Sequence, residues 1–320
     1  MFPTASRRNR RNCWKNSRKP LTETLRSSPR RRNAAKRRKT GTATTRTAAT
    51  RTTAAFSINF SEAVNMPQFV LKLEDIDGKR FTLRGPEAFH VTRVLRQKEG
   101  SEIDLFDGKG GKYTGVITTV HNDGSVEGDI THRAHAPMRP VPVDLHLYMG
   151  LLKKASNWEW VLEKGTELGV ASFTPVITPR TIVQARELSA NKVARWNKIM
   201  EGASKQCERG TLPALKEPQH FRDAVPSAAK RGLVLLGWER HPGATTYAGL
   251  RETLKKARTE HKKGLTLSLF IGPEGGFSDE ELKIAEYEGA NFFSLGPNVL
   301  RAETAAISAS SIILYELGTL

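Results

Sequence analysis

Two glycine-rich segments each follow a short apolar run and precede a helical pattern. The first apolar run, residues 265–271, ends in Gly-Pro-Glu-Gly-Gly at 272–276, and the second, residues 292–295, ends in Gly-Pro-Asn at 296–298. Strand-end loops of this kind expose backbone amides and carbonyls where open α/β sheets bind their ligands. We therefore expect one small-molecule site built from both loops, and the short spacing predicts that their strands are adjacent.

The two loops lack the residues that bind nucleotide phosphates. GPEGG has neither the GxxxxGK[ST] pattern nor a following lysine, and it does not contain GxGxxG. Bare backbone flanked by Ile271, Leu295 and Leu300 instead suits an adenine that carries a short zwitterionic tail. One such loop alone would be interpreted as an ordinary turn. Two loops, the second followed by Arg301 and Glu303 that we expect to be buried, favour a ligand site.

Strands and helices alternate upstream of these loops. The predicted strands are 143–149, 173–177 and 233–236, and the predicted helices are 154–168, 191–208 and 247–258. Ser278 is the predicted N-cap of the helix after the first loop, and a small-residue helix is expected from Ala302. This alternation predicts an α/β domain with a mostly parallel sheet and helices on both faces.

Residues 68–133 have a different pattern, typical of a small β-rich domain. Asp77-Gly78 indicates a hairpin, Pro86 begins a helix, and the following segments alternate as strands do, which fits a barrel of five or six strands. The apolar stripe of the helix is expected to consist of Phe89, Val91, Val94 and Leu95. The Pro-rich stretch 132–142 is predicted to be the boundary with the α/β domain.

The net charge of +18 is concentrated at the N-terminus. Residues 1–65 contain 17 Lys and Arg against two Glu, whereas the remainder contains 34 against 31 Asp and Glu. The tail has almost no apolar periodicity, so we expect it to be disordered. It could be a transit peptide or an RNA-binding arm, or translation could start at Met66. The third interpretation is preferred because all segments with the pattern of a strand or a helix follow Met66.

Several long stretches carry a resemblance to one known family. They read IGPEGGFSDEEL, SLGPNVLRAETAA, HVTRVLRQKEGSEIDLFDGKGGKYTGVI, LLKKASNWEWVLEKGTELGVASFTPVITPRT and WNKIMEGASKQCERGTLPAL. Together they resemble the RsmE family, bacterial RNA methyltransferases of the SPOUT superfamily that use S-adenosylmethionine. The resemblance covers residues 68–320 and leaves out only the tail.

The resemblance implies a fold and a set of cofactor contacts. Residues 138–320 would form a SPOUT domain threaded as a deep trefoil knot, and residues 66–137 a PUA-like RNA-binding β-barrel. The knot would consist of the two glycine loops. The implied cofactor-binding positions are Leu236, Gly272, Glu274, Gly275, Gly276, Leu295, Gly296 and Leu300. The family also implies a homodimer whose active site is shared across the subunit contact.

The implied reaction is methylation of ring nitrogen 3 of a uridine in small-subunit (16S) ribosomal RNA. The enzyme must align an in-line attack and help the weakly acidic imide lose its proton. Arg301 is the expected catalytic cation, and Glu303 or Glu274 would orient it or accept the proton. An Arg301–Glu303 or Arg301–Glu274 pair that only holds the knot is an equal alternative.

Other basic residues are candidates for RNA contact. Arg93 and Arg96 would share one exposed helix face, and Arg180, Lys205 and Arg209 could form a second basic surface. The tryptophans Trp158, Trp160 and Trp196 are expected in the core or in dimer contacts rather than as base-stacking platforms.

Two further functions are weighed against this one: a related methyltransferase acting on another RNA position, such as a ribose hydroxyl, and a non-catalytic RNA-binding assembly factor. The two cysteines, Cys13 and Cys207, and the scattered histidines show no metal-ligand spacing, so no metal is expected. No apolar run approaches the ~18 residues of a membrane span. We expect a cytoplasmic protein, or one of an organelle matrix if residues 1–65 are a transit peptide.

Overall fold

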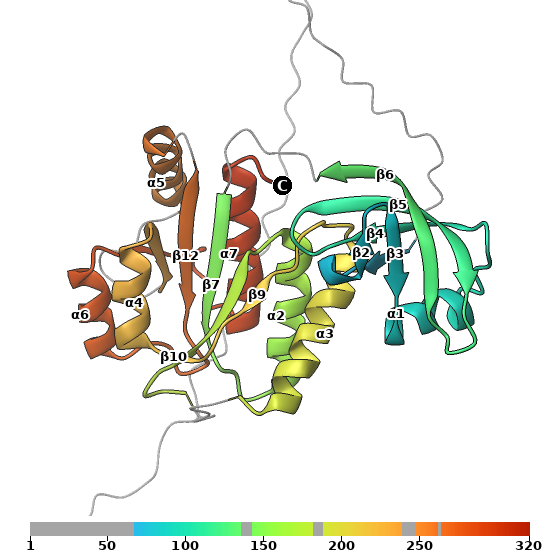
Figure 1. Cartoon of the computed structure of the whole chain (residues 1–320). Helices are drawn as coiled ribbons and strands as arrows, with labels where there is room; N and C mark the ends of the chain where they lie inside the picture. Colours follow the sequence, from blue (N-terminus) through green and yellow to red (C-terminus); the bar gives the residue numbers. More distant parts are fainter. Residues whose placement is uncertain (1–66, 136–142, 182–187, 239–246, 262–263) are drawn as a thin grey trace, which may run out of the picture. The chain divides into compact units, whose positions relative to one another are not determined.

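The computed structural model describes residues 67–135, 143–181, 188–238, 247–261 and 264–320 (Figure 1). The predictions about the basic tail and about the boundary at 137/138 fall outside these residues. Within the described residues, no helix is both long and apolar enough to cross a membrane.

The N-terminal part contains a six-stranded curled sheet. Its strands are β1 (Gln68–Val70), β2 (Ile76–Asp77), β3 (Arg80–Leu83), β4 (Glu102–Phe106), β5 (Gly111–Val120) and β6 (Val126–His135), in the order β1-β4-β5-β6-β3-β2. Alternate side chains of these strands fill one core, in which Phe69, Phe81 and Leu105 are almost fully buried. The predicted strand content is therefore confirmed, although β6 extends to His135, four residues into the stretch expected to be a linker.

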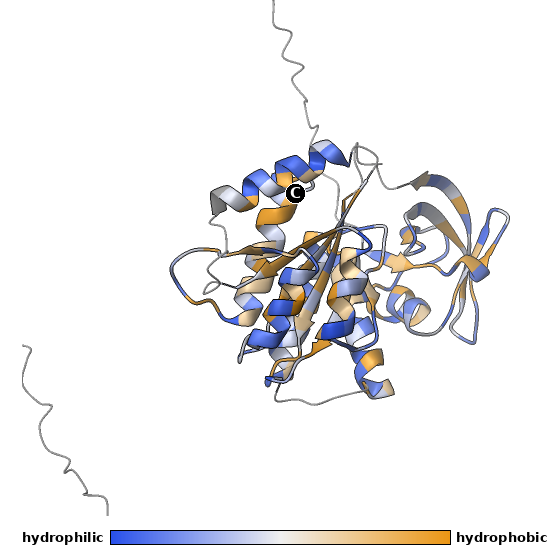
Figure 2. Ribbon diagram, turned by 90° about the vertical axis from the view of Figure 1, so that its left-hand side faces the viewer, coloured by the Kyte–Doolittle hydropathy of each residue, from blue (hydrophilic) through white to orange (hydrophobic). Residues whose placement is uncertain are grey.

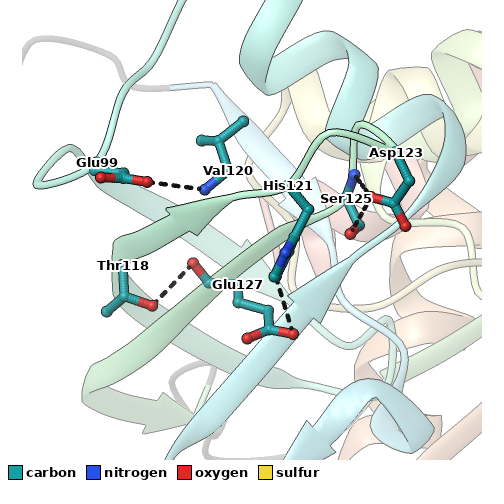
Figure 3. Close-up of polar contacts among 7 residues, drawn as sticks. All are labelled: Glu99, Thr118, Val120, His121, Asp123, Ser125 and Glu127. Atoms are coloured by element: carbon teal, nitrogen blue, oxygen red, sulfur yellow. Dashed lines mark hydrogen bonds and ion pairs between the residues drawn. The ribbon is translucent and has the colours of Figure 1, made fainter.

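The tight connection between β5 and β6 is held by its own polar side chains (Figure 3). Asp123 accepts hydrogen bonds from the backbone N–H and the hydroxyl of Ser125, at 2.8 and 2.6 Å. The Ser125 hydroxyl is also the main cause that lowers the pKa of Asp123. Nearby, His121 Nε2 lies 3.2 Å from a carboxylate oxygen of Glu127. These local bonds hold the connection between the two longest strands of the barrel.

The barrel helix differs from its prediction. Only α1 (Gly85–Phe89) is α-helical, and it continues as a π-helical turn, His90–Val94, which shifts the faces of the side chains. Val91 is buried, but Phe89 and Val94 are 60% and 56% exposed, so the predicted apolar stripe is wrong for these two residues. Arg96 follows the helix with a φ of 54° and does not share a helix face with Arg93.

The C-terminal part is a parallel sheet covered on both faces. Its main strands are β7 (Val143–Gly150), β8 (Ser172–Ile177), β11 (Leu233–Gly237), β12 (Leu265–Ile271) and β13 (Asn291–Phe293). Two short strands, β9 (Ala214–Leu215) and β10 (Gln219–His220), both pair with β8. The strand order is β10-β8-β7-β12-β11-β13, and every pairing is parallel. The predicted mostly parallel sheet is confirmed.

Helices lie on both sides of this sheet (Figures 1 and 2). One face is covered by α2 (Ala155–Leu168), α3 (Ala190–Gln206), α5 (Tyr247–Glu260) and α7 (Ala302–Glu316), and the other by α4 (Phe221–Ala229) and α6 (Asp279–Tyr287). Trp158 and Trp196 are buried and meet edge to face at 5.5 Å, as expected of core residues. Trp160 is 42% exposed, so it is not a core residue.

The strands that end in the two glycine loops are not adjacent. After β12 the chain forms α6 and returns as β13 on the far side of β11, which pairs with both β12 and β13. The prediction of adjacent strands is therefore wrong. As a consequence, the end of β11 and the residue after it, Trp238, come between the two loops, and Trp238 donates a backbone hydrogen bond to the Phe293 carbonyl at 3.0 Å.

A histidine in the sheet makes the stability of the fold depend on pH. His146 on β7 is half-buried, and its Nδ1 lies 2.7 Å from the Ser172 hydroxyl on β8. Burial, and secondly the positive charge of Arg231, lower the pKa of His146 below its ordinary value. The unfolded chain therefore binds a proton more readily than the folded one, and stability falls as the pH drops below the unfolded pKa of about 6.5.

We expect His146→Gln to remove this pH dependence. The free energy of unfolding, measured by urea titration at pH 7.5 and pH 5.5, should differ less between the two pH values in the variant than in the parent chain. His132→Gln, which changes an exposed histidine, is the matched control and should leave the difference as it is. If the free energy of unfolding changes as much between pH 7.5 and pH 5.5 in His146→Gln as in the parent chain, other groups cause the pH dependence.

Candidate active site

The first glycine loop joins β12 to α6. Gly276 has a φ of +67°, and its N–H donates to the Pro273 carbonyl at 2.8 Å, which closes the loop into a turn. Ser278 then caps α6 through a capping box with Glu281, as its position in the sequence predicts. Burial raises the pKa of Glu281, against the effect of the hydrogen bonds from Ser278. The loop is thus fixed at its C-terminal end by the start of α6.

The second glycine loop joins β13 to α7. Its start is ordered by the Ser294 hydroxyl, which donates to the Gly296 carbonyl at 3.0 Å. Its end is Arg301, the N-cap residue of α7, whose side chain makes no capping hydrogen bond. Arg301 therefore lies at the N-terminus of α7, and its guanidinium is not used to cap the helix.

A cavity of about 520 Å³ lies between the two loops. Its lining contains Gly272, Glu274, Gly275, Gly276 and Leu300 of the predicted cofactor set, together with Arg301 and Glu303 of the predicted catalytic set. Leu295 lines a smaller hollow of about 50 Å³ that shares Trp238 and Leu300 with the larger one. The volume falls in the range of pockets that bind drug-sized ligands.

Two predicted cofactor residues line neither hollow. The Leu236 side chain is fully buried in the core on the α4/α6 face of the sheet. Its neighbours Gly237 and Trp238 line both hollows instead. Gly296 is exposed, with a φ of +134°, and nothing lies within 4 Å of the position that a Cβ would take. The cofactor contacts at Leu236 and Gly296 therefore stay predictions, and at the end of β11 it is Gly237 and Trp238 that line the hollows.

Trp238 is the main site residue that the sequence reasoning missed. A Cβ placed on Gly276 would lie 2.3 Å from the indole Cζ3 of Trp238, so the ring rests directly on the first glycine loop. The indole also lies near the buried Phe277 ring, 6.2 Å between centroids. The available signal was its position directly after the strand 233–237, at the same sheet edge as the two loops.

The predicted catalytic residues come together at the cavity but do not pair with one another. Glu303 accepts a hydrogen bond from Asn157 Nδ2 at 2.8 Å, and Glu274 accepts one from the Lys153 N–H at 3.0 Å. Among the described residues, the Arg301 side chain makes neither a hydrogen bond nor an ion pair. Arg301 is also exposed rather than buried as expected. Neither proposed ion pair with Arg301 is present.

Three of the predicted RNA-binding cations are bonded within the protein. Arg180 donates to the carbonyls of Gly275 and Phe277. Lys205 on α3 pairs with Glu87 and Glu201. Burial lowers the pKa of Lys205, but its hydrogen bonds to Glu201 and Glu87 outweigh this, and the net shift is upward.

Arg209 supports α2 instead of lying free on a surface. Its Nη1 donates to the carbonyls of Thr166 and Val170, at 2.9 and 3.1 Å, beside the end of α2 at Gly169. Arg93 and Arg96, by contrast, are exposed and make no side-chain bond within the described residues. Of the five predicted RNA contacts, these two match the expected free surface.

The cavity has the features that an adenine-bearing cofactor needs. At its glycines the first loop presents bare backbone, and there is little room for a side chain, because a Cβ on Gly272 would lie 3.1 Å from the Gly276 Cα. Apolar walls are supplied by Ile271, Trp238 and Leu300, and polar groups by Glu274 and Asn157. Within the described residues no group of three or more His, Cys, Asp or Glu could hold a metal ion. The residues present therefore fit S-adenosylmethionine.

Comparison with known proteins agrees with this site. A sequence model of the RNA methyltransferase domain matches residues 139–314, and one of the RNA methyltransferase PUA domain matches residues 83–131. The fold and the site thus define an RNA methyltransferase. The chain is 30% identical over 240 residues to the ribosomal RNA small subunit methyltransferase E of Synechocystis, covering 74% of each chain. It belongs to the ribosomal RNA small subunit methyltransferase E (RsmE) family.

Further relatives extend the match over most of the chain. The Bacillus subtilis ribosomal RNA small subunit methyltransferase E is 28% identical over 238 residues, which are 74% of this chain and 90% of that protein. The crystal structure of the Neisseria gonorrhoeae ribosomal RNA small subunit methyltransferase E, bound to S-adenosylmethionine, has a TM-score of 0.66 and 28% identity, and covers 78% of this chain and 97% of that one. The predicted family, enzyme class and SPOUT plus PUA-like fold are confirmed.

Proposed function

We propose that this protein transfers a methyl group from S-adenosylmethionine to ring nitrogen 3 of a uridine in small-subunit ribosomal RNA. The observation that carries the proposal is the cavity between two glycine loops, at whose edge Arg301 has an unpaired guanidinium. Membership of the RsmE family and the cofactor bound by the Neisseria relative support it. The domain division at 137/138 is also proposed, since the two domain matches lie on either side of it.

The chain's own residues have separate tasks in this reaction. The cofactor supplies an activated, electrophilic methyl group. The glycine loops and Trp238 hold the ligand in one orientation, and alignment alone can contribute about 7–11 kcal/mol to lowering the barrier. The uracil imide must lose its proton, and Arg301 would stabilise the resulting oxyanion because its guanidinium is always charged and makes paired hydrogen bonds.

Two carboxylates could receive the imide proton or orient the substrate. Glu303 is half-buried and held in place by Asn157, whereas Glu274 is exposed and held by the Lys153 N–H. Both carboxylates accept a hydrogen bond, but the half-buried Glu303 is more restricted than the exposed Glu274, so its position is better set before the substrate binds. We therefore assign the proton acceptor to Glu303 and a substrate-orienting role to Glu274.

Methyl transfer from labelled S-adenosylmethionine to purified small ribosomal subunits and to free rRNA tests the proposal. We expect incorporation into the RNA of at least one of these substrates. Calorimetry separates the enzyme from a non-catalytic assembly factor, since an assembly factor that only retains the fold would not bind S-adenosylmethionine. Absence of both binding and incorporation would refute the proposal.

Arg93 and Arg96 form the proposed RNA contact of the barrel. Both are exposed, as is the ring of Phe89 in the same segment, and RNA binding by cations depends on counterion release. We expect the double change Arg93→Ala, Arg96→Ala to weaken RNA binding and to flatten its dependence on salt, measured by filter binding at 50 and 200 mM salt. Arg222→Ala, which removes an exposed arginine of α4, should change neither. Unchanged affinity of the double variant at low salt would remove this surface from the interface.

A second copy of the chain is the proposed partner for the outer faces of α2 and α7. These helices pack against each other and leave Trp160 and Tyr315 exposed, 42% and 69% respectively. Exposed aromatic residues are enriched at subunit interfaces. Light scattering should give the mass of a dimer.

A ribosomal RNA substrate supports a cytoplasmic location, or an organelle matrix if residues 1–65 are a transit peptide.

A further inference from the structure

Arg180 is bonded to the first glycine loop from outside it. Its Nη1 donates to the Phe277 carbonyl at 2.8 Å and to the Gly275 carbonyl at 3.2 Å. The backbone of Arg180 also packs against the loop. A Cβ placed on Gly275 would lie 3.0 Å from the Arg180 Cβ and 3.2 Å from the Arg180 carbonyl oxygen. One residue from another part of the chain thus contacts the loop through both side chain and backbone.

The turn that carries Arg180 is itself fixed. Thr178 and Thr181 are both buried, and their hydroxyl groups lie 2.9 Å apart. The Thr181 hydroxyl also accepts from the Thr178 N–H at 3.2 Å, and the Thr181 N–H donates to the Thr178 carbonyl at 3.1 Å. Because β8 ends at Ile177, this turn is anchored directly to the sheet. Arg180 is therefore presented to the loop from a defined position.

The loop has few means of its own to hold one conformation. Residues 272–276 contain three glycines, which lose more conformational freedom on ordering than other residues do. The internal bond from Gly276 to Pro273 and the α6 capping box fix part of the loop. The Gly275 and Phe277 carbonyls are fixed by Arg180, and hydrogen bonds from a charged donor are stronger than neutral ones. The positive charge of Arg180 also acts on the carboxylate of Glu281, the capping-box residue of α6: burial raises the pKa of Glu281, and Arg180 tends to lower it.

We propose that Arg180 is a positioning residue that holds the first glycine loop in the conformation that binds the cofactor. Gly272, Gly275 and Gly276 line the cavity, so a loop that relaxes away from Arg180 loses the backbone surface on which the cofactor rests. This inference replaces the RNA contact predicted for Arg180, and it rests on the proposed use of S-adenosylmethionine.

The test uses the full chain with Arg180→Met, which keeps the apolar stem and removes the donor, and with Arg180→Lys. S-adenosylmethionine affinity is measured by calorimetry, RNA affinity by filter binding without cofactor, and kcat at saturating cofactor. We expect Arg180→Met to weaken cofactor binding at least about tenfold, with RNA affinity and kcat within about twofold of the parent. Arg180→Lys should recover part of the affinity, since a point charge reaches one carbonyl but not both.

Hydrogen exchange gives a second readout that does not depend on activity. In Arg180→Met, amides of residues 272–278 should exchange faster without cofactor, while those of α2 and α7 do not change. Arg222→Met is the matched control, because it removes an exposed arginine that has no bond to the loop, and it should leave all three affinity and rate measurements unchanged.

The outcomes separate this inference from the proposed function. A salt-dependent loss of RNA affinity in Arg180→Met, with cofactor affinity unchanged, would overturn the positioning role and restore the RNA contact. Unchanged cofactor affinity together with unchanged exchange would also overturn it. A product other than N3-methyluridine would refute the proposed target while leaving the effect of Arg180 on cofactor binding intact.

Discussion

Arg301→Ala is expected to lower kcat for methyl transfer by at least about 10²-fold while the affinity for S-adenosylmethionine stays within about threefold. The guanidinium lies at the edge of the cavity and is not used by any structural bond among the described residues. Stabilising a proton-transfer transition state contributes about 10²–10⁴-fold, and this contribution would be lost. Single-turnover transfer at saturating cofactor measures the rate, and calorimetry measures the affinity.

Arg301→Lys provides the control for this prediction. Lysine retains the positive charge but not the planar paired donors, so it should show intermediate activity. The Arg301 side chain does not cap α7, and the thermal midpoint of Arg301→Ala should therefore remain close to that of the parent chain. An equal loss of cofactor affinity and of rate, accompanied by a lower midpoint, would instead show that Arg301 holds the two loops together.

Gly276→Ala is expected to weaken cofactor binding at least about tenfold. The residue has a φ of +67°, which costs roughly 1–2 kcal/mol for a residue with a Cβ. In addition, the new Cβ would lie 2.3 Å from Trp238 Cζ3 and 2.7 Å from Cη2, so the indole or the loop must move. Both groups line the cavity, and the displacement would change its shape. Calorimetric titration with S-adenosylmethionine measures the effect.

Gly289→Ala separates the clash from the backbone strain. Gly289 follows α6 with a φ of +74°, and nothing lies within 4 Å of the position its Cβ would take. The two variants therefore share a similar backbone cost, but only Gly276→Ala disturbs Trp238. Gly289→Ala should lower the thermal midpoint and leave cofactor affinity unchanged. Similar cofactor affinities in the two variants would contradict the account of the Gly276–Trp238 contact.

Local features of the C-terminal domain follow well from the sequence because they depend on neighbouring residues. Ser278 and Glu281 form the capping box at the start of α6, and Gly169 ends α2 with a φ of 98°. The apolar run 265–271 is buried as β12 in the middle of the sheet. These signals also placed both glycine loops at the same edge of the sheet, where the cavity lies.

Long-range features did not follow from the sequence. The insertion of β11 between β12 and β13 depends on how the chain is threaded, which no local spacing encodes. Arg180 and Arg209 were grouped by charge alone, whereas their partners are backbone carbonyls tens of residues away. Trp238 was missed for the same reason, since its contact with Gly276 depends on the strand order.

The exposed helix of the barrel shows a second limit. A regular 3.6-residue period predicts that Phe89 and Val94 are buried, but the π-helical turn at His90–Val94 changes the period and leaves both exposed. The spacing of apolar residues in the sequence does not indicate such a local change of helical period. In this chain the result is an exposed aromatic ring at Phe89, four residues before Arg93, which is proposed to contact RNA.

Analysis of the methylated nucleoside tests the central claim most directly. Small ribosomal subunits are incubated with the full chain and labelled S-adenosylmethionine, and the RNA is digested to nucleosides and examined by mass spectrometry, with Arg301→Ala in parallel. We predict 3-methyluridine with the parent chain and about 10²-fold less with the variant. Recovery of the label as a 2′-O-methylated nucleoside, or equal amounts of 3-methyluridine from both chains, would contradict the account.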